Sequence, residues 1–186
     1  SGLIENENLF IVVEMNYKEL QSKIYGCHSR VAEFLQQDSH QLNMLHIDIN
    51  RLVLNMLSAI RTFLDHKDTH LKRKFGKVSP ALSLFEKEKK EAFDNNFEYR
   101  FISKLRNFSQ HCGLPVESPE IKSFQNENFE VENQFNVFFE TEKLLSNFEW
   151  GTFVKKDLEL QPERFNVLPV IDRMYQLLAQ FKIGRA

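Results

Sequence analysis

The sequence has few of the residues and segments that mark specialised classes of protein. It contains two cysteines, Cys27 and Cys112, in 186 residues, which is too few for a disulfide framework and is typical of a reducing cytosol. Its longest uninterrupted apolar run is LFIVV at 9–13, far short of the roughly 20 residues that a membrane-spanning helix needs. No signal-peptide pattern precedes that run. We therefore expect a cytoplasmic protein without a membrane segment.

The sequence also lacks a strong charge of either sign. Its 24 Lys and Arg residues and 26 Asp and Glu residues give a formal net charge of -2, so any basic surface for nucleic acid has to be local. No internal repeat or low-complexity tract is present. With 42% hydrophobic residues and 18 Phe, the composition predicts one globular domain over residues 1–186 with a Phe-rich core. The opening Ser-Gly in place of Met is interpreted as an expression-tag remnant.

The clearest pattern in the chain is an apolar stripe between about 40 and 75. Apolar residues recur there at spacings of three and four, at Leu42, Leu45, Ile49, Leu52, Met56, Ile60 and Phe63. This spacing predicts one long amphipathic helix that ends at Gly76. A second helix is predicted over 80–112, with a buried stripe of its own, and the GLP at 113–115 ends it.

The remaining segments predict shorter elements. A helix is expected in the first 37 residues, around YKELQSKI. Residues 117–134 are rich in Glu and Asn and have poor periodicity, which favours a surface loop or an insertion. The apolar run after them allows a short β-element near 135–142. A last helix is predicted from Pro162, with Pro169 breaking or kinking it. The predicted fold class is all-α, a helical bundle with two long central helices.

Residues 104–116, KLRNFSQHCGLPV, end the second predicted helix with polar side chains that a helix end does not require. Arg106 and His111 lie five positions apart, so on a helix they point about 140° away from each other. His111 shares one side of the helix with Arg100, Lys104 and Asn107, which form a polar stripe beside the core. Arg106 and His111 either bond the last carbonyls of the helix or form part of a functional site, and composition alone leaves both interpretations open.

The segment RNFSQH resembles the motif of the HEPN family (higher eukaryotes and prokaryotes nucleotide-binding domains). It has an Arg, a polar residue, three further residues and a His near the end of a long helix that follows another long helix. LNMLSAIRTFLDH, LKRKFGK and FDNNFEYRFISKLRNFSQHCGLPV also resemble the helix pair of bacterial HEPN-like proteins. The resemblance implies a helical bundle, a homodimer with facing motifs and, in many members, metal-independent RNA cleavage in toxin, antiviral or RNA-processing systems. Other members bind nucleotides or are inactive.

The residue types of the motif suit RNA cleavage without a metal, in which the 2′-hydroxyl attacks the adjacent phosphate. Histidine exchanges protons near neutral pH, and Arg presents a charged donor fork that matches phosphate oxygens. We expect His111 to act as general acid or base, Arg106 to bind the phosphate, and Asn107 to position His111 or the substrate. Arg100 and Lys104 are predicted to bind RNA. No metal or cofactor is expected; the expected partners are RNA, a second copy of the chain and an antitoxin or regulatory protein.

One departure from the family limits what the resemblance implies. In one toxin branch a Tyr follows the motif His by two residues and is modified by a partner nucleotidyltransferase, but position 113 is Gly here, so that regulation is not predicted. The alternative to an endoribonuclease is a noncatalytic interaction or nucleotide-binding module with the same fold. The intact motif favours the enzyme, whereas the unexceptional net charge favours the module.

Neighbouring residues also have two interpretations each. The basic residues at 72–74 and Lys77 attract phosphate or, as we favour, form a solvated helix end. Arg61 and His66 repeat the Arg-to-His spacing of the motif, but neighbouring carboxylates explain them more simply. His66 and His70 have the one-turn spacing of a helical metal pair, yet HKDTH lacks the Glu of a zinc-protease motif. Cys112 next to His111 imitates a nucleophile pair, but adjacent residues on a helix point about 100° apart.

Overall fold

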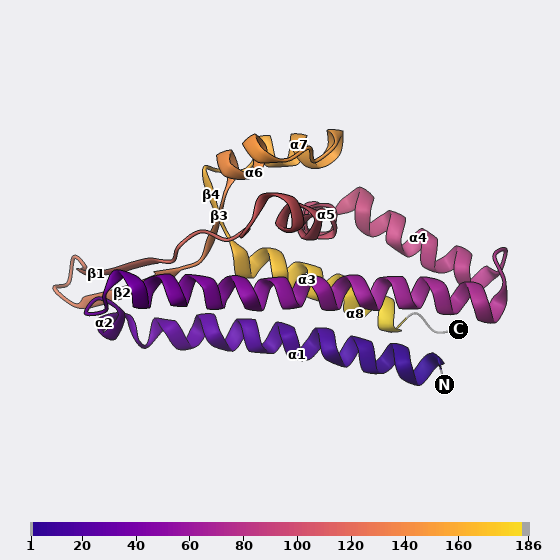
Figure 1. Cartoon of the computed structure of the whole chain (residues 1–186), viewed down its shortest axis with the longest axis horizontal. Coiled ribbons are helices and arrows are strands. Elements are labelled where there is room, and N and C mark those ends of the chain that lie inside the picture. The colour runs from indigo at the N-terminus through magenta and orange to yellow at the C-terminus, as the bar shows by residue number, and fades with distance from the viewer. Residues whose placement is uncertain (1, 184–186) are drawn as a thin grey trace.

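The structure is a computed structural model that describes residues 2–183, so Ser1 of the supposed tag remnant lies outside it. Two long helices, α1 (Gly2–His28) and α3 (Ser39–Phe75), run antiparallel along the length of the molecule, and the short α2 (Val31–Phe34) lies between them in the chain (Figure 1). The helix predicted around YKELQSKI is therefore confirmed as part of α1.

The predicted helix of 40–75 is confirmed as α3, and local signals fix both of its ends. Asp38 precedes the helix and accepts a hydrogen bond from the backbone N–H of Gln41 at 2.8 Å, while the Gln41 side chain accepts one from the Asp38 N–H at 3.1 Å. This reciprocal pair is a capping box. Gly76, with a φ of 85°, ends the helix. Most of the predicted stripe is buried, at Leu45, Ile49, Leu52, Met56, Ile60 and Phe63.

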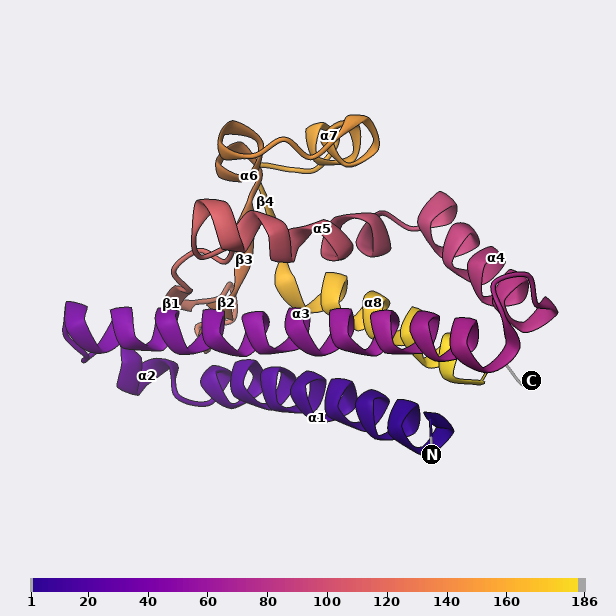
Figure 2. The same ribbon diagram turned by 45° about the vertical axis from the view of Figure 1, so that its right-hand side comes forward.

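The prediction of one helix over 80–112 is wrong, because the chain bends between α4 (Pro80–Asn95) and α5 (Phe97–Cys112) (Figure 2). Asn96 has an extended backbone, with φ -134° and ψ 116°. Its Oδ1 accepts hydrogen bonds from Nε and Nη2 of Arg173 at 3.1 and 2.9 Å. The apolar spacing runs across this point without interruption, and the contact with Arg173, a residue far along the chain, stabilises the break.

The prediction of a surface loop over 117–134 is also wrong. Strands β1 (Glu120–Gln125) and β2 (Val131–Asn136) form an antiparallel ribbon, closed by a turn in which Asn126 Oδ1 accepts two backbone N–H groups. Most residues of the ribbon are exposed on both faces. A ribbon of this kind has no alternation of apolar and polar residues, which is the pattern that predicts a strand.

A second small ribbon pairs β3 (Phe138–Glu140) with β4 (Arg164–Asn166), also antiparallel. The β-element predicted near 135–142 is thus confirmed for β3, although the chain becomes helical immediately after it. Two short helices that the sequence did not predict, α6 (Thr141–Asn147) and α7 (Thr152–Glu159), connect the two strands.

The last helix, α8 (Val167–Ile183), begins five residues later than predicted, because residues 164–166 pair with β3 instead. Pro169 is the third residue of this helix and does not break it. Backbone N–H groups in the first turn have no partner within the helix, so a proline there removes no hydrogen bond.

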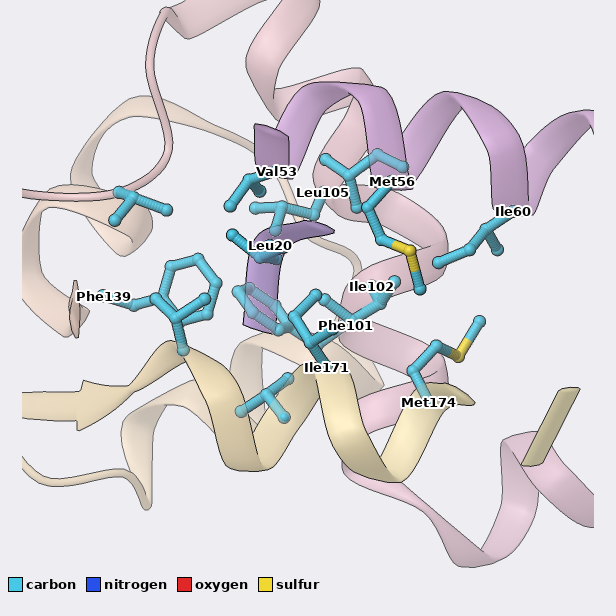
Figure 3. Packing of buried hydrophobic residues seen from close by; sticks show 14 of the residues in the cluster. Leu20, Val53, Met56, Ile60, Phe101, Ile102, Leu105, Phe139, Ile171 and Met174 are labelled. Atoms are coloured by element: carbon cyan, nitrogen blue, oxygen red, sulfur yellow. The ribbon is translucent and has the colours of Figure 1, made fainter. Parts of the chain in front are cut away.

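The core lies where α1, α3, α5 and α8 meet (Figure 3). Phe101 is in ring contact with Phe139, Trp150 and Phe165, with centroids 5.2 to 5.8 Å apart, as expected of a Phe-rich core. The chain is mainly helical, as predicted, with two small ribbons added. Across residues 2–183, every helix is too short or too polar to cross a bilayer. The single domain of residues 1–186 stays a prediction.

Candidate functional site

Helix α5 lies between two parts of the molecule, with α3 and α8 on one side and α6 and α7 on the other (Figures 1 and 2). Its side toward the core buries Phe101, Leu105 and Phe108 completely. The helix ends at Gly113, whose φ of 108° is one that residues with a side chain rarely adopt. The polar residues of α5 lie on the sides of the helix that do not face the core.

An open cavity of about 380 Å³ lies between α3, α4 and α5. The α5 wall of this cavity consists of Tyr99, Ile102, Ser103, Arg106 and Asn107. Helix α3 adds apolar side chains, and α3 and α4 both add charged ones. Two of the three predicted catalytic residues, Arg106 and Asn107, thus line one cavity.

The charged side chains of the cavity form ion pairs with one another, apart from Arg106. Three of the four cations in the lining have carboxylate partners, in the pairs Arg61–Asp65, Lys72–Asp68 and Lys89–Glu86. Burial acts to raise the pKa of Asp68, but hydrogen bonds with Lys72, Glu86 and Lys89 outweigh it and hold that pKa below its ordinary value. Within residues 2–183, Arg106 makes neither an ion pair nor a hydrogen bond.

The third predicted catalytic residue, His111, lies on the last turn of α5 and is exposed. It does not line the cavity, but it follows Asn107 by one helical turn on neighbouring faces of α5. Neither Arg106 nor His111 donates a hydrogen bond to a carbonyl of the described chain. The interpretation that these two side chains serve to bond the last carbonyls of the helix is therefore not supported.

The two predicted RNA-binding residues do not line the cavity, and their side chains contact α7 and the residues just before it. Arg100 donates from Nε and Nη2 to the two carboxylate oxygens of Asp157 in α7, at 2.7 and 3.1 Å. Lys104 donates to the carbonyl oxygen of Trp150. The next residue, Gly151, has a φ of 77°, and a Cβ at this position would lie 2.8 Å from the Lys104 Nζ. These contacts give both cations a structural role, and RNA binding by them stays a prediction.

Cys112, which follows His111 in the chain, turns its side chain toward a different helix. Both Cys112 and Cys27 are free thiols, and Cys112 Sγ lies 2.9 Å from the carbonyl oxygen of Asn147. This contact directs the thiol toward α6, so the structure gives no support to a nucleophile pair with His111.

The two histidines near the end of α3 do not form a metal centre. The rings of His66 and His70 are parallel, with centroids 6.2 Å apart, and His66 Nε2 lies 3.5 Å from a carboxylate oxygen of Glu5. Burial lowers the pKa of His70 below its ordinary value. In the described part of the chain, no group of three or more His, Cys, Asp or Glu side chains is arranged to hold a metal ion.

A pair of polar residues that the sequence did not single out fixes the chain just after α5. Asn50 is fully buried in α3; its Nδ2 donates to the carbonyl oxygen of Val116 at 3.0 Å, and its Oδ1 accepts the Val116 N–H at 3.0 Å. A ring nitrogen of His46 also lies 2.7 Å from the Val116 carbonyl oxygen. The position of Asn50 beside the apolar stripe was the available clue, because a buried amide requires partners.

No family model matches this chain, and neither a curated protein nor a solved structure does. The likeness to the HEPN family therefore rests on the quoted residues. Fold and site together define a mainly helical protein with an open cavity. One arginine of its lining, Arg106, has no partner among the described residues and lies on the same helix as the exposed His111.

Proposed function

We propose that the chain is an endoribonuclease with a HEPN-like fold that cleaves RNA without a metal ion. One observation carries the proposal: Arg106 is the cation of the cavity lining that has no carboxylate partner within residues 2–183, whereas the other three are paired. A guanidinium with free donors next to an open cavity suits a phosphate. The RNFSQH motif supplies Asn107 and His111 on the same helix.

The proposed reaction uses the 2′-hydroxyl of the RNA as nucleophile. Its oxygen attacks the adjacent phosphorus, and the bond from phosphorus to the 5′-oxygen of the next nucleotide breaks, which leaves a 2′,3′-cyclic phosphate and a 5′-hydroxyl. His111 removes the proton from the 2′-hydroxyl or delivers one to the leaving oxygen. Arg106 stabilises the charge that develops on the phosphate oxygens. Asn107, between the two on the helix surface, positions His111 or the substrate.

Arg106 and His111 of a single copy point about 140° apart on α5, so one copy does not readily bring both onto one phosphate. A two-fold axis near the end of α5 places the same patch of two copies face to face. We therefore propose a homodimer in which each site takes residues from both chains. The family resemblance implies the same arrangement. It also implies an antitoxin or other regulatory protein as partner. The protein would then act in the cytoplasm, in a toxin-antitoxin or phage-defence setting.

The alternative is a noncatalytic module of the same fold that binds a nucleotide or another protein. One observation favours it: His111 lies outside the cavity that Arg106 and Asn107 line. On this alternative the cavity binds its ligand through Arg106 and no proton is transferred.

Incubation of the purified chain with total RNA in excess EDTA tests the proposal. We expect cleavage to persist and to leave 2′,3′-cyclic phosphate ends, and light scattering to show a dimer. His111→Ala and Arg106→Ala should each reduce the cleavage rate at least about 100-fold. The matched controls His40→Ala and Arg73→Ala, at exposed positions of α3, should cleave at the wild-type rate. Wild-type cleavage by both site variants, or activity that requires a divalent ion, would contradict the assignment.

A further inference from the structure

The α5 wall of the cavity presents a row of polar groups without protein partners. Tyr99, Ser103, Arg106 and Asn107 follow one another at spacings of four, three and one, which places them within an arc of about 100° on the helix. The Ser103 hydroxyl oxygen is buried and has no hydrogen-bond partner. The Tyr99 hydroxyl and the Asn107 amide also form no hydrogen bond within residues 2–183. Buried polar groups nearly always have partners, so within this row it is the unpaired Ser103 hydroxyl that points to a ligand.

The opposite walls restrict which part of a ligand fits there. Asp65, Asp68 and Glu86 line the α3 and α4 sides, and their pairing with the cations of those walls leaves no free positive charge on that side. A second phosphate on that side of the cavity would lie near these carboxylates and be disfavoured. The α3 and α4 side of the cavity therefore suits an uncharged group, whereas the anionic group belongs at Arg106.

Apolar side chains also belong to the lining of the cavity. Leu57, Ile60 and Ile102 are at most 3% exposed and line the same cavity as the polar row. The volume of about 380 Å³ falls within the range of small-molecule sites, which combine apolar walls with a few polar groups that fix orientation. A planar ring with hydrogen-bonding edges fits such walls, and a nucleobase is the planar ring that an RNA chain carries.

We propose that the cavity receives one unpaired nucleobase of the RNA, whose edge is read by Tyr99 and Ser103 while Arg106 holds the neighbouring phosphate. The proposal rests on the endoribonuclease assignment above and makes these two hydroxyls the determinants of sequence preference. Tyr99 and Arg106 are about 10 Å apart along the helix axis, which separates the base contacts from the phosphate contact. Bases of single-stranded RNA are commonly read through their edges in this way.

The surroundings of Tyr99 keep its hydroxyl protonated and in place. Its ring contacts Phe181, with centroids 6.0 Å apart at an interplanar angle of 80°. Burial, assisted by the negative charge of Glu86, raises the pKa of Tyr99 to about 12. The hydroxyl is therefore available both to donate and to accept a hydrogen bond at physiological pH, as a base edge requires.

Two measurements test the proposal with the hydroxyl-deleting variants Tyr99→Phe and Ser103→Ala. The first is binding of each nucleoside 3′-monophosphate, followed by NMR titration of the full chain. The second is sequencing of the 5′ ends that cleavage of total RNA produces. We expect one base or base class to bind best and to be enriched at the cleavage site. Each variant should lower that preference about tenfold, whereas Ser109→Ala, whose hydroxyl is bonded to the Leu105 carbonyl of the same helix, should keep it.

The outcomes separate this proposal from the function on which it rests. Urea unfolding of each variant first shows that it is folded. Cleavage without any base preference, or a preference that both variants retain, overturns the base-reading role and leaves the ribonuclease intact. Selective monophosphate binding that both variants lose, without any RNA cleavage, supports the cavity assignment and rejects the enzyme. Absence of both cleavage and monophosphate binding overturns both proposals.

Discussion

Arg100 and Arg106 lie less than two turns apart on α5, yet their surroundings differ completely. Arg100 forms a two-point ion pair with Asp157, and the two side chains are only 14% and 20% exposed. Arg106 borders an open cavity and has no partner within residues 2–183. The side of α5 toward α7 thus uses its cations to hold the fold together, whereas the side toward α3 leaves polar groups available for a ligand.

The comparison shows that residue type and helical position do not separate structural from functional cations. Both arginines and Lys104 were predicted to bind RNA or its phosphate from their residue type and their place on the predicted helix. What separates them is whether the rest of the fold brings an acceptor to them. A side chain that is already bonded has to give up that bond before it can bind RNA, so the unpaired side of the helix is the better candidate for a site.

The largest expected effect comes from removing the charge on each side of α5 in turn. Arg106→Gln should lower RNA cleavage at least about 100-fold and change the free energy of unfolding by less than about 0.5 kcal/mol. Arg100→Gln should do the reverse and lower the free energy of unfolding by about 2 kcal/mol, because it leaves Asp157 without its partner. Urea unfolding and cleavage by the folded protein measure the two effects. The comparison fails if Arg100→Gln is as inactive as Arg106→Gln while equally stable.

A smaller effect is expected from Gly151→Ala on the α7 side. The φ of 77° and ψ of 169° at this position are strained for a residue with a side chain, so the free energy of unfolding should fall by about 2 kcal/mol. Part of this penalty comes from the Lys104 Nζ, which a Cβ would approach to 2.8 Å. The same substitution in a Lys104→Ala background should therefore cost less. Equal penalties in both backgrounds, measured by urea unfolding, would show that the close approach does not matter.

The smallest effect is expected at the unpaired hydroxyl of the cavity. Ser103→Ala removes a buried oxygen without a partner, so in the absence of ligand the free energy of unfolding should stay the same or rise by about 0.5 kcal/mol. Thr141→Val is the contrasting case, because the Thr141 hydroxyl donates to the Pro162 carbonyl oxygen at 2.6 Å, and its loss should cost about 1 kcal/mol. A clear destabilisation by Ser103→Ala would mean that the hydroxyl serves the fold rather than a ligand.

Elements with local signals in the chain could be predicted from the sequence. Helix α3 was predicted almost to the residue because its apolar stripe and terminal Gly76 agree with each other, and the capping box that the structure shows at its start is also local. The ribbon of β1 and β2 was missed, since its residues are exposed on both faces and leave no alternating pattern. The break at Asn96 was missed because Arg173, which stabilises it, is 77 residues away.

The sequence likewise predicted only some of the residues of the candidate site. The motif pointed to Arg106, Asn107 and His111, and two of these do line one cavity. It gave no indication of Tyr99 or Ser103, which no motif contains and which stand out only because they share that cavity without partners. It also grouped Arg100 and Lys104 with the site, although Asp157 and Trp150 occupy them.

The sequence by itself determined α3 and the directions of the polar side chains on α5, because hydrogen bonds between residues four apart fix helical geometry locally. The angle of about 140° between Arg106 and His111 follows from their spacing alone. Only the tertiary structure decided which of these polar groups are free. Asp157 reaches Arg100 because α7 packs on one side of α5, whereas the carboxylates across the cavity pair with Arg61, Lys72 and Lys89. These three pairs form within single helices at spacings of three and four. Packing between α3, α4 and α5 decided that, within residues 2–183, no carboxylate pairs with Arg106.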